Sequence, residues 1–193
     1  VPRNRTLIMA GLGGEHPGAF LDVQNFNILC PGGISRSGMH NGAIDGLFYA
    51  NMLNVKEIIP WLAESYKYNA DFTSVDVKIR KGAEWSDGKP FTARDCVFQI
   101  NTLMANKTMF YSTDLNIYVK KAEAPDDYTL KLTFNSPSPR SFFDYLVHWA
   151  DFGIPFYMAE HVWKDVKEPD KFNNYDPAKG WPLVTGPFKL VAS

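Results

Sequence analysis

The stretch from Gly11 to Gly18 is the first segment whose composition suggests chemistry, since glycine-rich loops can cradle phosphate groups. A dinucleotide-binding fingerprint would need glycine where His16 stands. A phosphate-binding loop would need a Gly-Lys-Ser/Thr run, which the sequence lacks. We therefore interpret this stretch as a glycine loop that follows a strand, and we expect no nucleotide site.

Histidines are the next candidates, as metal ligands or as bases. The sequence has four of them: His16, His40, His148 and His161. No two are spaced i, i+4, and no Cys-x-x-Cys accompanies them, so the sequence predicts neither a metal site nor a cofactor. Of the four, His148, next to Trp149, is the candidate for a functional role. The alternative is a structural role, as a surface residue at the end of a helix.

Acid–base catalysis needs two carboxylates held in different environments. Glu84 and Asp87 are close in sequence, but both fall in a turn-rich stretch that we expect to be exposed, and Asp87 before Gly88 is typical of a turn. The sequence has no Gly-x-Ser-x-Gly elbow and no cysteine–histidine signature. We therefore expect no catalytic residues and no enzyme activity.

Charge and composition narrow the class further. The 193 residues carry 20 Lys+Arg and 21 Asp+Glu, and a net charge of −1 argues against a nucleic-acid partner or a polybasic membrane surface. Aromatic residues make up 15%, which indicates a ring-rich core or rings that line a ligand surface. Whether Cys30 and Cys96 pair cannot be decided from sequence, although Cys96 fits a buried free thiol.

No apolar run approaches the roughly 18 residues of a membrane span. The chain opens at Val1 with no signal peptide, as mature exported chains also do, so an extracytoplasmic location stays open.

The predicted strands and helices follow one another without a regular strand–helix–strand order, which favours a mixed α/β (α+β) fold. The hydrophobic patterns predict strands at 6–10, 75–80, 115–119, 128–134 and 186–191, with loops over most of 11–46. They predict helices at 92–105 and 139–150. Thr92 with Asp95 three residues later fits a capping box, and Ser138-Pro139 fits a helix start.

One long segment, Lys78 to Phe98 (KIRKGAEWSDGKPFTARDCVF), resembles the signature of the family 5 extracellular solute-binding proteins, which are receptors of bacterial ABC importers. The family order is a strand end, an aromatic-x-Asp-Gly-x-Pro turn, and Thr-Ala-x-Asp opening a helix. Other pieces match in the same order: Gln24–Asn27, Pro60–Tyr66 and Thr185–Leu190. Ala83 and Cys96 stand where the family usually has valine.

The resemblance implies a fold and an extent. It implies lobe one of a type II periplasmic-binding-protein-like fold, with the second lobe absent from these residues. Residues 1–193 would form the N-terminal part of that lobe, with a possible subdomain boundary near 45–60. The signature residues themselves are expected to make the turn and cap the helix without touching a ligand.

The resemblance also implies a role. It implies capture of a small solute, a peptide or an oligosaccharide, in the periplasm or outside the cell, and its delivery to ABC permease transmembrane subunits. The protein would be monomeric at full length, and a lipid anchor could be attached through an N-terminus outside this chain. Peptide is the leading ligand; oligosaccharide follows because five tryptophans offer stacking faces: Trp61, Trp85, Trp149, Trp163 and Trp181.

The expected ligand-binding residues are Asn27, Phe48 and Trp149, because loops at strand and helix ends would face the cleft. Each has a structural alternative: Asn27 in a local turn, the two rings in the core. Two other functions stay open. One is a secreted carbohydrate-active enzyme that uses carboxylates such as Glu84 or Asp151, and the other is a stand-alone interaction module.

Overall fold

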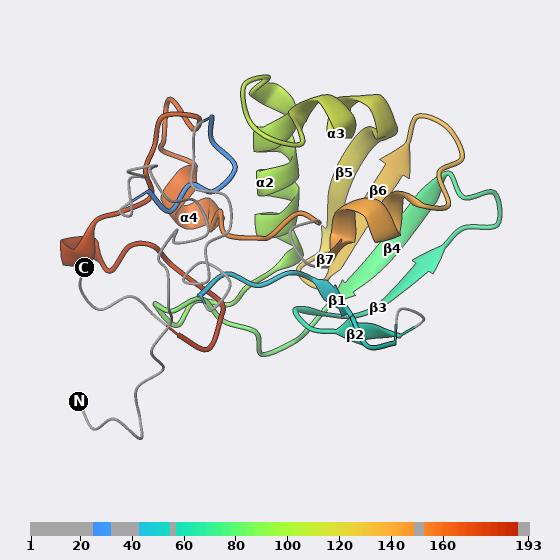
Figure 1. The fold of residues 1–193 in the computed structure, drawn as a ribbon, viewed down its shortest axis with the longest axis horizontal. Coiled ribbons are helices and arrows are strands. Elements are labelled where there is room, and N and C mark those ends of the chain that lie inside the picture. Colours follow the sequence, from blue (N-terminus) through green and yellow to red (C-terminus); the bar gives the residue numbers. More distant parts are fainter. Residues whose placement is uncertain (1–24, 32–42, 55–56, 149–152, 189–193) are drawn as a thin grey trace.

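A four-stranded antiparallel sheet in the order β3-β4-β6-β5 is the largest element of the computed structural model, which describes residues 25–31, 43–54, 57–148 and 153–188 (Figure 1). Its strands are β3 (Ala63–Tyr68), β4 (Ser74–Ile79), β5 (Val119–Asp126) and β6 (Thr129–Phe134). Helix α2 (Ala93–Ala105) stands between this sheet and the segment 153–188. The class is mixed α/β, as the sequence predicts.

Strand β4 follows the alternation of its sequence. Val75, Val77 and Ile79 are buried, whereas Asp76 and Lys78 are exposed. Successive side chains of a strand point to opposite faces, so the three apolar side chains share one face and lie in the same core cluster as the buried apolar residues of α2, and the predicted strand is confirmed.

Helix α2 begins where the capping pattern predicts. Thr92 is the N-cap, and its backbone N–H donates to Oδ2 of Asp95 at 2.8 Å. The buried face of the helix includes Cys96, Ile100 and Leu103. Cys96 and Cys30 are both buried free thiols, so they do not pair, and burial raises the pKa of the Cys96 thiol.

The prediction of a strand at 115–119 is wrong. Residues Ser112–Tyr118 form helix α3, and β5 starts at Val119. The Asn116 side chain supports the helix in two ways: it donates to the Met104 carbonyl at 2.9 Å, which fastens α3 to the end of α2, and to the Ser112 carbonyl within α3 at 2.8 Å. The predicted antiparallel partner of 128–134 is real, but it is the strand 119–126.

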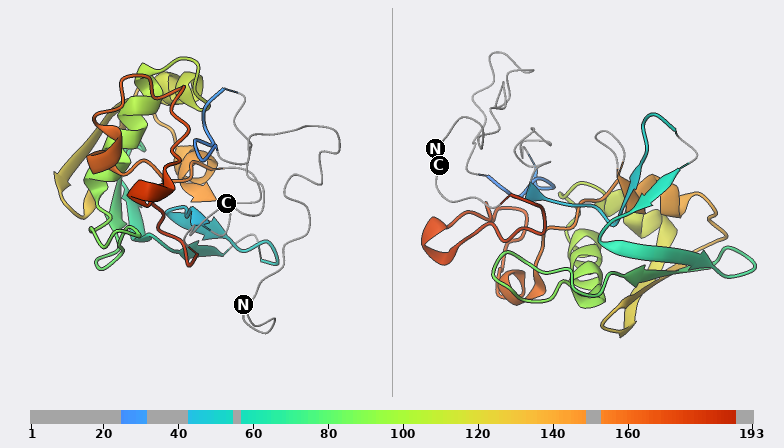
Figure 2. Two further views of the ribbon diagram at one scale, coloured as in Figure 1. Left: turned by 90° about the vertical axis from the view of Figure 1, so that its left-hand side faces the viewer. Right: turned by 90° about the horizontal axis from the view of Figure 1, so that it is seen from below.

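The predicted helix at 139–150 is also wrong in extent. A π-helical turn, η2 (Phe142–Leu146), is followed at once by strand β7 (Val147–His148). The chain leaves the helix because β7 pairs in parallel with β1 (Phe48–Ala50), whose other neighbour is the antiparallel strand β2 (Ile58–Pro60). Figure 2 shows the β1–β2 hairpin projecting from the rest of the chain.

The segment 153–188 carries little regular structure: helix α4 (Glu160–Trp163) and a 3₁₀ turn, η3 (Pro177–Lys179). Residues 186–188 are not a strand, which corrects the described part of the prediction for 186–191. The rest of that prediction, the strand at 6–10 and most of the loop at 11–46 lie outside the described residues. In the described ranges no helix is both long and apolar enough to span a membrane.

Candidate functional site

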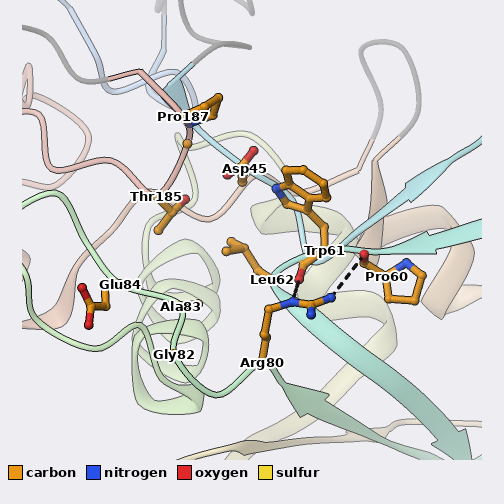
Figure 3. Close-up of a pocket in the computed structure, with 11 residues that line it drawn as sticks. Asp45, Pro60, Trp61, Leu62, Arg80, Gly82, Ala83, Glu84, Thr185 and Pro187 are labelled. Carbon is orange, nitrogen blue, oxygen red and sulfur yellow. Dashed lines mark hydrogen bonds between the residues drawn. The ribbon is translucent and has the colours of Figure 1, made fainter.

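A pocket of about 540 Å³ lies where four stretches of chain meet beside the sheet that β2, β1 and β7 form (Figure 3). Asp45 precedes β1, the link between β2 and β3 forms one wall, the turn after β4 forms another, and residues 185–187 close the last side. Its lining residues are Asp45, Pro60, Trp61, Leu62, Arg80, Gly82, Ala83, Glu84, Thr185, Gly186 and Pro187. This volume is within the range of small-molecule sites.

Asp45 is the pocket's buried charge, with 5% of its surface exposed. The Tyr49 hydroxyl donates to its Oδ1 at 3.1 Å and accepts the Gly46 N–H at 3.2 Å. Burial raises the pKa of Asp45, and hydrogen bonding from Trp61 and Tyr49 offsets only part of that rise. Burial, and then the nearby Asp45, also raise the pKa of Tyr49, so this phenol stays a donor.

Arg80 and Trp61 shape the mouth of the pocket. The Arg80 guanidinium donates to the backbone carbonyls of Trp61 and Pro60, which holds the link between β2 and β3 in place (Figure 3). Trp61 is 45% exposed, so part of its indole is open to a ligand. A carboxylate, an aromatic face and a guanidinium together can orient a polar solute through hydrogen bonds and stacking.

Asn27, an expected ligand contact, lies elsewhere and is fully buried. Its Nδ2 donates to the carbonyls of Pro169 and Phe172 at 2.7 and 2.8 Å, and its Oδ1 accepts the Tyr157 hydroxyl at 2.7 Å. The Asn27 side chain therefore links residues 25–31 to the segment 153–188, because all three of these hydrogen-bond partners belong to that segment. Its role as a ligand contact stays a prediction.

Phe48, the second expected contact, is 1% exposed and packs edge-on against Phe142. Its neighbour Tyr49 points the other way along β1 and holds the pocket carboxylate. Sequence reasoning missed Tyr49 and Asp45; the period of two along a strand could have indicated that one of two adjacent aromatics faces away from the core. Trp149 lies outside the described residues, directly after β7.

The carboxylates considered for catalysis are not brought together as a pair by any interaction within the described residues. Glu84 lines the pocket, whereas Asp87 contacts His161 Nε2 at 2.9 Å and lies 3.9 Å from the Lys89 ammonium. Partial burial raises the pKa of Asp87, but the Lys89 backbone N–H and His161 outweigh it, so that pKa lies below its usual value. Asp151 lies outside the described residues.

Metal-binding side chains do not gather in the described ranges: no three His, Cys, Asp or Glu residues there form a group that could hold an ion. Of the tryptophans, Trp85 and Trp163 are buried, and Trp181 lies under the Lys179 ammonium at 4.6 Å. Trp61 is therefore the tryptophan that offers a face to the pocket. The pocket thus offers a carboxylate, a guanidinium and a partly exposed indole from separate parts of the chain.

The family is shown by comparison with known proteins. Residues 57–193 match the family described as "Bacterial extracellular solute-binding proteins, family 5 Middle", and the chain belongs to this family. The signature segment 78–98 lies wholly inside the match.

Curated relatives are much longer than this chain. It is 29% identical over 133 residues to the uncharacterized protein YejA of Escherichia coli, covering 69% of the chain and 20% of YejA. It is 27% identical over 136 residues to a putative ABC transporter peptide-binding protein of Brucella ovis, covering 70% of the chain and 24% of that relative. The chain thus spans about a quarter or less of their length.

Among solved structures, the chain is similar to the mannohexaose-bound periplasmic oligopeptide-binding protein of Thermotoga maritima. The TM-score is 0.61 at 27% identity, and the match covers 76% of this chain and 25% of that one. The described residues therefore have the fold of one part of a type II periplasmic-binding protein.

Proposed function

We propose that this protein captures a solute outside the cytoplasmic membrane and delivers it to the permease subunits of an ABC importer. The observation that carries the proposal is the family match over residues 57–193, which covers most of the chain and all of the signature segment. A role in binding, without covalent chemistry, agrees with a pocket that offers a carboxylate, an aromatic face and a guanidinium.

Peptides are the leading ligands, because the relative from Brucella ovis is named a peptide-binding protein. Oligosaccharides are the second candidate. The similar protein from Thermotoga maritima was solved with mannohexaose bound, and the half-exposed Trp61 can stack on a sugar ring. Binding would work through hinge closure, in which contacts made only in the closed state shift the equilibrium. A periplasmic or extracellular location, with or without a lipid anchor, belongs to this proposal.

Calorimetric titration of the chain with trialanine and with mannohexaose tests the proposal. We expect binding of one of them in the millimolar range, about −4 kcal/mol, because the chain spans about a quarter of its relatives' length and would supply only one side of an interlobe site. Failure of both to bind at about ten times that concentration would overturn the proposal. So would the appearance of hydrolysis products by chromatography, which would favour an enzyme.

Trp149→Ala tests the ligand-contact prediction for the residue after β7. We expect weaker binding at unchanged stability. The matched control is Phe72→Ala. Phe72 lies in the turn between β3 and β4, at the end of the hairpin away from the pocket, and its ring is 44% exposed, so its removal should leave binding unchanged. Full affinity in a folded Trp149→Ala variant would remove this residue from the site.

A further inference from the structure

The Asp45 carboxylate is buried in the pocket wall without an ion pair in the described part of the chain. Arg80 lines the same pocket, but its guanidinium donates to the carbonyls of Pro60 and Trp61. Hydrogen bonds from Tyr49 and Trp61 offset only part of the cost of burying this carboxylate, and a cationic partner would offset more of it. The pocket therefore favours a cation beside Asp45.

Thr185 supplies a second acceptor. Its Oγ1 is shielded from solvent and has no hydrogen-bond partner among the described residues. A buried hydroxyl without a partner is uncommon and needs an explanation, for which a bound ligand is one. Figure 3 shows Thr185, Asp45 and the Trp61 indole around the same part of the pocket, with Arg80 and Glu84 farther along its wall.

Two acceptors thus line one space, the Asp45 carboxylate and the Thr185 hydroxyl, with the partly exposed Trp61 indole beside them (Figure 3). A primary ammonium group has three N–H donors and no acceptor, and it is attracted to an indole face. Anions are disfavoured because Asp45 and Glu84 outnumber the one cationic lining residue, Arg80. Leu62 and Pro187 add apolar wall for an aliphatic stem.

We infer that this pocket binds a primary ammonium group carried on a short apolar stem, with Asp45 as its counter-ion and Thr185 as its second acceptor. The group can belong to a free alkylamine or to the N-terminus of a peptide. This inference stands apart from the transport role, since it concerns the chemistry of one pocket whatever solute the protein carries.

Titration followed by ¹⁵N–¹H NMR shifts, with n-butylammonium as the probe, tests the inference. We expect saturable shifts at the pocket, including the Trp61 indole N–H. The neutral n-butanol and the anion butyrate should bind at least about tenfold more weakly, since a hydrogen-bonded charge pair is worth more than a neutral contact. Equal affinity for n-butanol, or tighter binding of butyrate, would overturn the inference.

Two variants locate the ammonium. Asp45→Asn should weaken n-butylammonium binding about tenfold. Thr185→Val, which keeps the side-chain shape, should weaken it about threefold. Glu168→Gln is the control, since it removes an exposed carboxylate outside the pocket and should change nothing. Unchanged affinity in a folded Asp45→Asn variant would refute the assignment; if that variant does not fold, Thr185→Val and the pH dependence decide.

Affinity for n-butylammonium should rise with pH as Asp45 ionises, and because burial raises the pKa of Asp45, this rise should lie above the ordinary aspartate value of 3.8. The other titratable or charged groups here are Tyr49, Glu84, Arg80 and His148, whose ring packs on Tyr49. Glu84 is the second carboxylate that lines the pocket, so Glu84→Gln must keep the pH dependence if Asp45 causes it. A flat profile, or one lost in Glu84→Gln, would contradict the role of Asp45.

Trialanine and N-acetyltrialanine separate the two sources of the ammonium group. Tighter binding of trialanine supports a peptide N-terminus as the occupant, whereas binding of n-butylammonium alone supports a free amine. If mannohexaose or trialanine binds while n-butylammonium does not, the inference fails and the proposed function stands. If n-butylammonium binds while neither proposed solute does, the proposed function fails and the inference stands.

Discussion

Removing the Asn27 side chain should cost much of the stability of this protein. Asn27→Ala deletes two N–H donors, to the carbonyls of Pro169 and Phe172, and the acceptor of the Tyr157 hydroxyl. The two carbonyls would be left unpaired, and the Tyr157 hydroxyl would keep only the Leu29 N–H that donates to it, at a site that is fully buried in the native protein. At about 1 kcal/mol for each lost hydrogen bond, and more where the partner stays dry, the expected loss is about 3–4 kcal/mol.

Urea denaturation followed by tryptophan fluorescence measures this loss, and calorimetry should show a melting temperature about 10 °C lower. The matched control is Asn101→Ala, an exposed asparagine on α2, which should change stability by less than about 0.5 kcal/mol. A double-mutant cycle with Tyr157→Phe isolates the hydrogen bond to the tyrosine and should give a coupling of about 1 kcal/mol.

The opposite result would refute the reasoning. If Asn27→Ala changed the free energy of unfolding by less than about 0.5 kcal/mol yet abolished ligand binding, Asn27 would be a ligand contact, and the hydrogen bonds would contribute little.

Three further predictions concern a helix cap, a strained glycine and an acidic side chain. Thr92→Ala should lower the unfolding free energy by about 1 kcal/mol in urea and leave ligand binding unchanged, since it removes an N-cap outside the pocket. Gly153→Ala should cost more than about 2 kcal/mol, because φ is +89° and a Cβ would lie 2.4 Å from a backbone oxygen. Gly180→Ala, with φ +71° and open space around it, should cost less. Asp87→Asn should reduce the loss of stability on acidification. The pKa of Asp87, beside His161, is lower in the folded protein than its ordinary value of 3.8, so the ionised carboxylate stabilises the fold at pH values above 3.8, and this contribution is lost as the pH falls through the lowered pKa.

Strand β4 and helix α2 could be predicted because their signals are local. In β4 every second side chain is apolar, and at the start of α2 Thr92 and Asp95 are three residues apart, so neither depends on a distant partner. Residues 115–119 show the opposite case. Their apolar residues alternate as in a strand, but the helix that forms is tied to α2 by the hydrogen bond from Asn116 to the Met104 carbonyl, and the alternation of apolar residues does not encode this contact.

The pocket could not be predicted for the same reason. Asp45, Trp61 and Thr185 come from three separate parts of the chain. Their meeting depends on the pairing of β1 with β2 and on backbone hydrogen bonds on either side of Thr185, from Ser86 to Val184 and from Gly186 to Ala43. Between the adjacent aromatics Phe48 and Tyr49, sequence reasoning chose the ring that packs in the core. The boundary near 45–60 stays a prediction.

The signature segment lies mostly apart from the pocket, yet it determines where one pocket wall stands. The Ser86 N–H donates to the Val184 carbonyl at 2.8 Å, and the Val184 N–H donates to the Ser86 hydroxyl at 3.3 Å. Val184 directly precedes Thr185, so the turn that identifies the family positions the hydroxyl beside Asp45. A second hydrogen bond links the signature segment to the segment 153–188. In the first turn of α2, Asp95 Oδ1 accepts the Glu160 N–H at 2.9 Å, which fixes the start of α4. Residues that touch no solute can therefore set the geometry of a binding pocket through backbone hydrogen bonds.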